Sequence, residues 1–266
     1  MNDILKEIAE NKKREVSALF YGPSGSSYAG WVRDEAAKRG GKFSLKDSIL
    51  SRYEKGQPGI IAEFKRRSPS KGDIAPMASI LPRITAYEAG GAAGCSVLTD
   101  TRFFGGALSD LATARAHSGL PLLRKDFIVD ENQIYEAAAF GADVILIIAS
   151  ILERGQIESF VELAHSLNLE VLYEIHTPDE LDKMPDDVDM LGVNNRRLSS
   201  FVTDVRHSAD MIGYLPHDRV LVAESGITSV QDVRKLMQMG YQGFLIGEAL
   251  MRNGDPAGTL GEFIYE

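Results

Sequence analysis

The sequence predicts an α/β protein that folds as a single (β/α)8 TIM barrel with an N-terminal helical extension. Eight short apolar runs, bounded by Gly, Asp or Asn, have the length and composition of buried parallel strands. Most of these runs are separated by about 15–20 residues with helical periodicity. An open doubly wound sheet is the main alternative, but its G-x-G-x-x-G signature is absent after the first run. Eight alternating units in one chain therefore favour the closed barrel.

The expected barrel elements follow one another through most of the chain. We expect strands at Gly59–Phe64, Gly94–Leu98, Leu120–Arg124, Asp143–Ala149, Glu170–Glu174, Met190–Val193, Val220–Ala223 and Gly243–Ile246. The clearest helical patterns cover Asn132–Phe140, Gln156–Leu167 and Ser229–Met239. Gly141 and Gly240 come directly after two of these patterns, where helix C-caps are expected.

Residues 1–50 precede the first expected strand. They begin with an amphipathic stretch that includes Ile4, Leu5 and Ile8, and they continue through the Gly/Ser-rich segment GPSGSSYAG at 22–30. We interpret this region as an extra helix and a loop that lie across the barrel. Residues 1–50 are thus expected to be an extension and not an independent domain, with residues 51–266 forming the catalytic barrel.

Composition and charge narrow the possible partners. With 44% hydrophobic and 25% charged residues, the 266-residue chain has an ordinary globular composition. Its net charge of −9 disfavours nucleic acid and membrane surfaces, but not a small anion held by a few cations. The only cysteine, Cys95, cannot form an internal disulfide. No signal peptide and no apolar run near the roughly 20 residues of a membrane span are present, so we expect a cytoplasmic protein.

Polar side chains gather where the expected strands end, which is where barrels of this class build their active sites. The period of two along a strand places Glu63 and Lys65 on one face, and Lys125 and Phe127 on another common face. Because a buried carboxylate is costly unless it is paired, we expect Lys65 or Lys125 beside Glu63. The polar residues at strand ends are Glu63, Lys65, Asp100, Lys125, Asp126, Glu174, His176, Asn194, Arg196, Glu224, Ser225 and Glu248.

The last two strand-to-helix loops predict a phosphate site. ESGI at 224–227 and LIGEAL at 245–250 each place a glycine just after an apolar strand. In barrels, backbone amides and a short helix at these two loops commonly receive a phosphate. We interpret His176 as structural, and the other histidines show no metal-ligand spacing. The sequence therefore predicts a small phosphorylated ligand and no metal site.

Several segments resemble the indole-3-glycerol-phosphate synthase family. They follow one another between about residue 59 and residue 251, with motifs on seven of the eight expected strands. The segments are IAEFKRRSPSKG (61–72), SVLTDTRFFGG (96–106), LLRKDFIVDENQIYEA (122–137), YEIH (173–176), GVNNRRL (192–198), VAESGI (222–227) and LIGEALM (245–251).

The resemblance implies a reaction and its catalytic residues. The family closes the indole ring of 1-(2-carboxyphenylamino)-1-deoxyribulose 5-phosphate with loss of CO₂ and water, and no cofactor is required. By resemblance, Lys125 is the principal general acid, and Glu174 assists dehydration as a base or an electrostatic stabiliser. Glu63 would orient Lys125 by pairing with it. Lys65 would bind anionic groups of the substrate or act as a second acid, and Asn194 matches the site asparagine.

The same resemblance implies the residues that bind substrate. Arg196 matches an anion-binding arginine, and Phe104 and Phe127 match aromatic residues that pack on the aminobenzoate ring. The remaining matches are Ser68 in a loop that would cover the substrate, Glu224 in support of the site, and Ser225, Gly226, Gly247 and the Glu248 amide in the phosphate cradle. Because Glu248 would contribute through its backbone, its carboxylate is expected to point away from the phosphate.

Physical chemistry adds one expectation and leaves two alternatives open. A lysine acid suits this reaction when burial among apolar neighbours, or a nearby ammonium, lowers its pKa toward neutrality. A phosphoribosylanthranilate isomerase-like barrel would instead use a Cys/Asp pair, for which only Cys95 is available. A non-catalytic barrel that binds a phosphometabolite would be indicated by loss of Lys125 or Glu174, and both residues are present.

Overall fold

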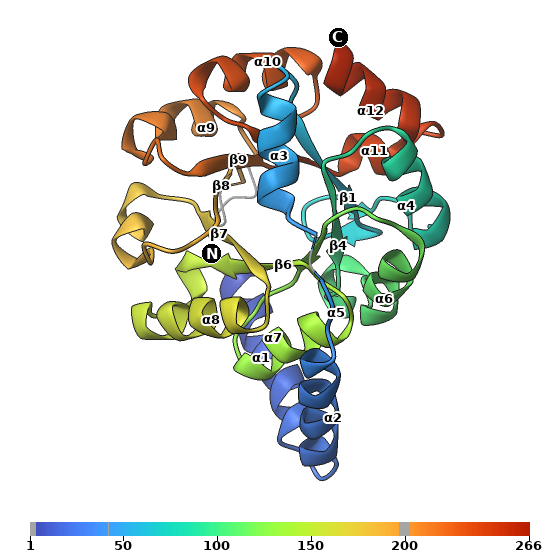
Figure 1. Ribbon diagram of the computed structural model, residues 1–266, viewed down its shortest axis with the longest axis vertical. Coiled ribbons are helices and arrows are strands. Elements are labelled where there is room, and N and C mark those ends of the chain that lie inside the picture. Colours follow the sequence, from blue (N-terminus) through green and yellow to red (C-terminus); the bar gives the residue numbers. More distant parts are fainter. Residues whose placement is uncertain (1–3, 42, 197–202) are drawn as a thin grey trace.

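Eight parallel strands close into a barrel with helices around it, as the sequence predicts (Figure 1). The computed structural model describes residues 4–41, 43–196 and 203–266. Around the barrel the strand order is β1-β10-β9-β8-β7-β6-β5-β4. The strands are β1 (Gly59–Phe64), β4 (Gly94–Leu98), β5 (Leu122–Lys125), β6 (Val144–Ile148), β7 (Glu170–Ile175), β8 (Met190–Asn194), β9 (Val220–Glu224) and β10 (Gly243–Ile246).

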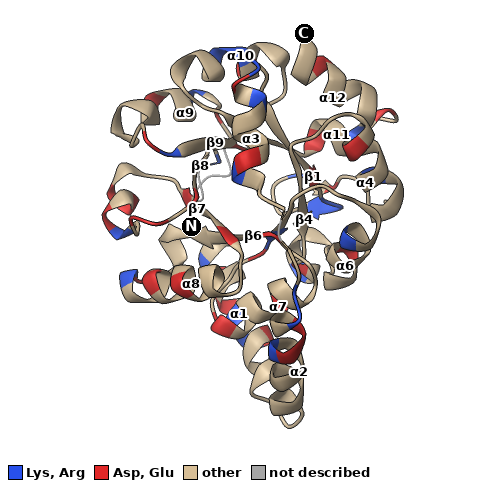
Figure 2. Cartoon of the chain, viewed as in Figure 1, with Lys and Arg blue, Asp and Glu red and all other residues tan. Residues whose placement is uncertain are grey.

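The connections between strands are mostly helical. Acidic and basic residues are interspersed on the outer helices (Figure 2). Between β1 and the first outer helix, β2 (Arg67–Ser68) and β3 (Gly72–Asp73) form a small antiparallel hairpin. The outer helices are α4 (Ile80–Ala89), α5 (Thr101–Phe104), α6 (Leu108–His117), α7 (Glu131–Ala139), η1 (Ala149–Ile151), α8 (Arg154–Ser166), η2 (Pro178–Lys183), α9 (Arg206–Met211), η3 (Ile212–Tyr214), α10 (Val230–Met239), α11 (Glu248–Arg252) and α12 (Pro256–Tyr265).

The eight predicted strands are confirmed, with ends that differ by at most two residues. Each is fully buried or nearly so, because one face packs inside the barrel and the other packs on the helices. The three predicted helices are also present, as α7, α8 and α10. Within the described ranges, no helix is both long enough and apolar enough to cross a membrane.

The N-terminal end of the barrel is closed by α3 (Leu45–Tyr53). Its Leu45 and Ile49 are fully buried in the cluster that fills the barrel interior. Two strands begin with glycine where this helix approaches: a Cβ on Gly59 would lie 2.9 Å from the Ile49 side chain, and one on Gly94 would lie 2.5 Å from Leu45. The helix therefore seals the end of the barrel opposite the strand C-termini.

The Gly/Ser-rich segment differs from the expectation. It does not form a loop: α1 (Ile4–Phe20) is followed by a tight turn, and α2 (Gly25–Ala37) begins inside the segment. A Cβ on Gly25 would collide with the carbonyl of Phe20, so this glycine allows the two helices to turn back on each other. Tyr28 then ties α2 to α7 by donating a hydrogen bond of 2.6 Å to Glu136. The two helices extend from one side of the barrel (Figure 1).

Candidate active site

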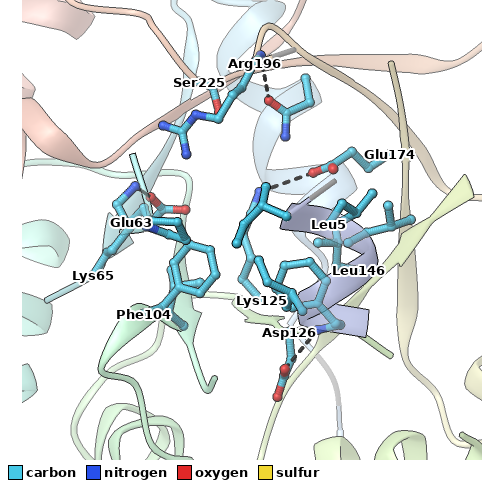
Figure 3. A pocket seen from close by; sticks show the side chains of 17 residues that line it. Leu5, Glu63, Lys65, Phe104, Lys125, Asp126, Leu146, Glu174, Arg196 and Ser225 are labelled. Atoms are coloured by element: carbon cyan, nitrogen blue, oxygen red, sulfur yellow. Dashed lines mark hydrogen bonds and ion pairs between the residues drawn. The ribbon is translucent and has the colours of Figure 1, made fainter. Parts of the chain in front are cut away.

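An open cavity lies at the C-terminal ends of the strands. Counted with its mouth, it encloses about 770 Å³. Figure 3 shows charged side chains from several strands pointing into it above an apolar wall. The lining residues are Ile4, Leu5, Ile8, Glu63, Lys65, Pro69, Leu98, Phe104, Lys125, Asp126, Phe127, Leu146, Ile148, Glu174, Asn194, Arg196 and Ser225. All five residues proposed as catalytic from the sequence are among them.

Lys125, the last residue of β5, lies at the centre of the charged group. Its Nζ donates to Glu224 and lies 3.6 Å from Oε2 of Glu174. Burial alone would lower the pKa of Lys125, but the carboxylates of Glu224, Glu174 and Glu63 outweigh it and raise the pKa above its ordinary value. The expectation of a lowered lysine pKa is therefore wrong for the free enzyme, because carboxylates and not ammonium groups surround this lysine. Lys125 is held as an ammonium.

Glu224 ends β9 beneath Lys125 and is fully buried. Burial and the neighbouring Glu174 raise its pKa to about 7, against the opposing attraction of Lys125. Room for this carboxylate comes from β8, where a Cβ on Gly192 would collide with Oε1 of Glu224. Gly192 appears in the sequence only as the first residue of GVNNRRL, and its role depends on the pairing of β8 with β9.

Glu63 and Lys65 form a second charged pair. Lys65 Nζ donates to Glu63 Oε1, and both side chains come from the face of β1 that the period of two predicts. Among the described residues, Lys125 forms its ion pairs with Glu174 and Glu224 and not with Glu63. The expectation that Glu63 orients Lys125 by pairing is wrong, because Lys65, the residue directly after β1, pairs with the Glu63 carboxylate instead. Burial would raise the pKa of Glu63, but Lys65 and Lys125 lower it below its usual range.

The opposite rim carries groups suited to an anion. Arg196 and Ser225 face the cavity together (Figure 3), and Oδ1 of Asn194 accepts a hydrogen bond of 3.0 Å from the Arg196 backbone. Ser225 has a left-handed backbone with φ of 67°, which turns the loop sharply after β9. The fully buried Asn195, which sequence reasoning missed, holds this loop by donating to the Ser225 carbonyl at 3.1 Å.

Other residues expected in the phosphate cradle lie beside this rim and do not line the cavity. Gly247 packs on Glu63, since a Cβ there would lie 2.5 Å from Oε1. The Glu248 carboxylate accepts from Arg252 on its own helix at 3.1 Å, and its other oxygen lies 3.9 Å from Lys71 Nζ. Ser68 is buried in the hairpin next to Pro69, which lines the cavity, and Gly226 follows Ser225 in the same turn with φ of 74°.

The apolar wall combines two predicted aromatic residues with a helix that was not predicted to take part. The rings of Phe104 and Phe127 lie 6.0 Å apart with a tilted geometry. Ile4, Leu5 and Ile8 of α1 complete the wall. The amphipathic pattern of this helix was visible in the sequence, but the partner of its apolar face was not.

A buried lysine fastens α1 to the barrel. Lys12 Nζ lies 3.0 Å from Asp100 Oδ2 and 3.0 Å from Asp126 Oδ1. Asp126 also accepts from Thr99 and Arg124, and it points away from the cavity centre (Figure 3). Burial would lower the pKa of Lys12, but the two aspartates raise it above its ordinary value. This ion pair fixes the helix that supplies the apolar wall.

Comparison with known proteins identifies the family. A family model described as indole-3-glycerol phosphate synthase matches residues 5–263. The chain belongs to the indole-3-glycerol phosphate synthase family. An indole-3-glycerol phosphate synthase of Bacteroides thetaiotaomicron is 44% identical over 264 residues, covering 99% of this chain and 98% of the relative. One of Burkholderia multivorans is 40% identical over the whole of both chains. The chain is accordingly a carbon–carbon lyase of tryptophan biosynthesis.

Solved structures with low identity share the fold. The 3-hexulose-6-phosphate synthase of Salmonella typhimurium has a TM-score of 0.61 and 14% identity, over 77% of this chain and 96% of that one. A mutant tryptophan synthase alpha-subunit of Pyrococcus furiosus has a TM-score of 0.58 and 16% identity, over 78% and 98%. At such identities the likeness extends to the barrel only.

One further observation disfavours the isomerase-like alternative. Cys95 is fully buried and burial raises the pKa of its thiol, so it offers no thiolate for an isomerase-type pair. Across residues 4–41, 43–196 and 203–266, no group of three His, Cys, Asp or Glu could hold a metal ion. Of the GVNNRRL motif, Arg197 and Leu198 lie outside the described residues.

Proposed function

We propose that the cavity closes the indole ring of 1-(2-carboxyphenylamino)-1-deoxyribulose 5-phosphate, with Lys125 as the acid. One observation carries the proposal: the Lys125 ammonium lines the cavity within ion-pair distance of two carboxylates, and two aromatic rings line the same cavity. A general acid must hold a proton before the reaction and must reach the reacting oxygen. Lys125 meets the first requirement by its charge and the second by its place among the lining residues.

The proposal divides the chemistry among the charged groups. The ring carbon attacks the carbonyl carbon of the ketone, and Lys125 gives its proton to the carbonyl oxygen as the C=O π bond breaks. CO₂ then leaves. Glu174, on β7 two strands away from Lys125 around the barrel, accepts the proton of the ring nitrogen as the hydroxyl group leaves as water. Glu224 stabilises the ammonium from below in the ground state. Lys65, fixed by Glu63, attracts the substrate carboxylate and can supply a second proton.

The proposal assigns the two ends of the substrate to two sides of the cavity. Arg196, Ser225 and the adjoining turn through Gly226 supply a cation, a hydroxyl and backbone amides for the phosphate. Phe104 and Phe127 offer ring faces to the aminobenzoate group. The remaining support comes from Asn194 and Ser68 and from the backbone of Gly247 and Glu248.

The proposal also covers the organisation of the chain. Residues 1–50 act as an extension that completes the barrel 51–266 through α1 and α3 and that has no separate activity. A cytoplasmic location and a small phosphorylated substrate are part of the proposal, and membership of a biosynthetic enzyme family supports both. The hairpin of β2 and β3, which carries Ser68, covers the bound substrate.

Indole fluorescence tests the function directly. Purified protein mixed with the carboxyphenylamino sugar phosphate should produce indole fluorescence with saturation kinetics. Binding of the substrate without product, measured by calorimetry, would instead indicate a non-catalytic phosphometabolite-binding barrel. Turnover of the phosphoribosyl amine and not of the sugar phosphate would indicate the isomerase. Either result would overturn the proposal.

A further inference from the structure

His176 is a buried polar group that the proposed chemistry leaves unused. It directly follows β7, two residues after Glu174, and the alternation along the strand puts both on the inner side. Its side chain is 9% exposed, and within the described residues neither ring nitrogen has a hydrogen-bond partner. Burying such a ring without a partner is unfavourable. Packing alone therefore does not account for a histidine at this position.

The ring is held close to a catalytic carboxylate. Nε2 of His176 lies 3.7 Å from Oε1 of Glu174, just beyond hydrogen-bond distance. The other nitrogen, Nδ1, lies 4.0 Å from Glu180, whose carboxylate already accepts the backbone N–H groups of His176 and Thr177. The His176 carbonyl is in turn 2.9 Å from Nε2 of His207. The backbone is thus fixed on two sides while Nε2 faces Glu174.

Burial keeps the ring of His176 neutral. Burial lowers the pKa of His176 below its ordinary value, and the opposing effect of nearby carboxylates does not restore it. A neutral imidazole carries one N–H, which can sit on Nε2. The titratable groups that face the ring are Glu174 on its own strand, Glu180 on η2, His207 on α9, Glu224 on β9 and Lys125 on β5.

We propose that His176 is a positioning residue whose Nε2–H donates to Glu174 once Lys125 turns to the substrate. In the free enzyme Lys125 lies 3.6 Å from Glu174 and stabilises its charge. When the ammonium engages the substrate oxygen and gives up its proton, Glu174 loses this cation. A shortening of a few tenths of an ångström brings the imidazole donor into range. The donor then takes the place of the ammonium beside the Glu174 carboxylate for the dehydration step. This inference rests on the proposed function of the same site.

The test compares kcat as a function of pH in four proteins: wild type, His176→Phe, His176→Gln and His176→Asn. A carboxylate without cation or donor takes up a proton more readily. We therefore expect His176→Phe to lower kcat about tenfold at neutral pH, and to move the acidic fall of kcat up by about one pH unit. KM should stay within about twofold, since His176 is not among the residues that line the cavity.

The amide variants separate donation from packing. Gln places an amide nitrogen about as far from the backbone as Nε2, whereas Asn reaches only the Nδ1 position. His176→Gln should therefore recover kcat to within about threefold of wild type, and His176→Asn should resemble His176→Phe. If the Phe variant does not fold, the Gln and Asn pair decides the matter by itself. His165→Gln is the matched control: this half-buried histidine pairs with Asp189 away from the cavity and should change neither kcat nor the pH profile.

Two outcomes overturn the inference, and they are distinguishable. If wild type forms product and the three His176 variants share the same profile of kcat against pH, the Nε2–H group does not donate a hydrogen bond that matters for turnover. Absence of indole product from folded wild-type protein overturns the proposed function, and this inference with it.

Discussion

Two buried lysines, Lys12 and Lys125, have similar surroundings but different roles. Lys12 anchors a helix, and Lys125 is the proposed acid. Each is ringed by carboxylates from other elements: Asp100 and Asp126 around Lys12, Glu174 and Glu224 around Lys125. Carboxylates raise the pKa of both lysines against the effect of burial. Charge and burial therefore do not separate an anchor from a catalyst in this protein.

The two lysines differ in whether a substrate can reach them. Lys125 is 14% exposed and lines an open cavity, whereas Lys12 is 7% exposed and does not line it. The partners of Lys12 are also committed elsewhere, since Asp100 caps α5 and Asp126 accepts from Arg124 and Thr99. A substrate can replace carboxylates around Lys125, but nothing can enter around Lys12. The following substitutions test this distinction.

Lys125→Ala should have the largest effect on turnover. Removal of the proposed general acid should lower kcat by about 10³-fold or more, within the range for lost acid catalysis. The fold should persist, because the cavity admits water to the carboxylates left behind. Indole fluorescence and circular dichroism measure the two quantities. Lys46→Ala in α3, at the opposite end of the barrel, should keep full activity. Residual Lys125→Ala activity within tenfold of wild type would contradict the role.

Lys12→Met should have the largest effect on stability. It removes the cation beside buried Asp100 and leaves Asp126 with Arg124 alone. Breaking a buried ion pair typically costs about 3–5 kcal/mol in the free energy of unfolding. Urea denaturation followed by circular dichroism measures the loss, and Lys13→Met on the exposed face of α1 is the control. Under folding conditions kcat should remain within about tenfold of wild type. If folded Lys12→Met lost all activity, Lys12 would also be required for catalysis, and the proposed difference between the two lysines would be wrong.

Glu224→Gln should change the pH dependence. Glu224 contributes most to raising the pKa of Lys125, so a neutral amide should lower that pKa. If Lys125 must be protonated to act, activity is lost as pH rises through its pKa. The alkaline fall of kcat/KM should therefore move down by about one pH unit or more, and any inflection from Glu224 near pH 7 should disappear. An alkaline limb that stays in place would show that another group controls it.

Phe104→Leu should have the smallest effect. An aromatic pair contributes about 0.5–1.5 kcal/mol beyond the area it buries, so loss of ring contact with the substrate should raise KM about two- to tenfold. Steady-state kinetics should show a much smaller change in kcat. Phe103→Leu, the neighbouring residue that does not line the cavity, is the control. Equal KM values for the two variants would place the aminobenzoate ring elsewhere.

The strands could be predicted because their signal is local. The composition of a buried run such as Val144–Ile148 is enough to predict a strand. The two-residue period of a strand also correctly placed Glu63 and Lys65 on one face. The partner of Lys125 could not be predicted in this way. Glu224 lies 99 positions away, and its approach depends on how the closed barrel brings the strand ends together.

The N-terminal region shows the same limit. Gly25 and its serine neighbours are typical of loops, and only the packing of α2 on α7 makes them helical. The pairing of Lys12 with Asp100 and Asp126 left no sequence signal, because each residue alone resembles a solvated charge. Local pattern therefore predicted the barrel and most of the charged residues at its mouth, whereas long-range packing determined their ion pairs and the part that α1 plays in the cavity.

Gly192 makes two neighbouring strands dependent on each other. One methyl group at this position would occupy the space that Glu224 needs, although Gly192 itself carries no charge and meets no substrate. The catalytic charges could therefore be displaced by a change in β8 that alters none of them. Redesign of this barrel for another substrate must keep or exchange positions 192 and 224 together.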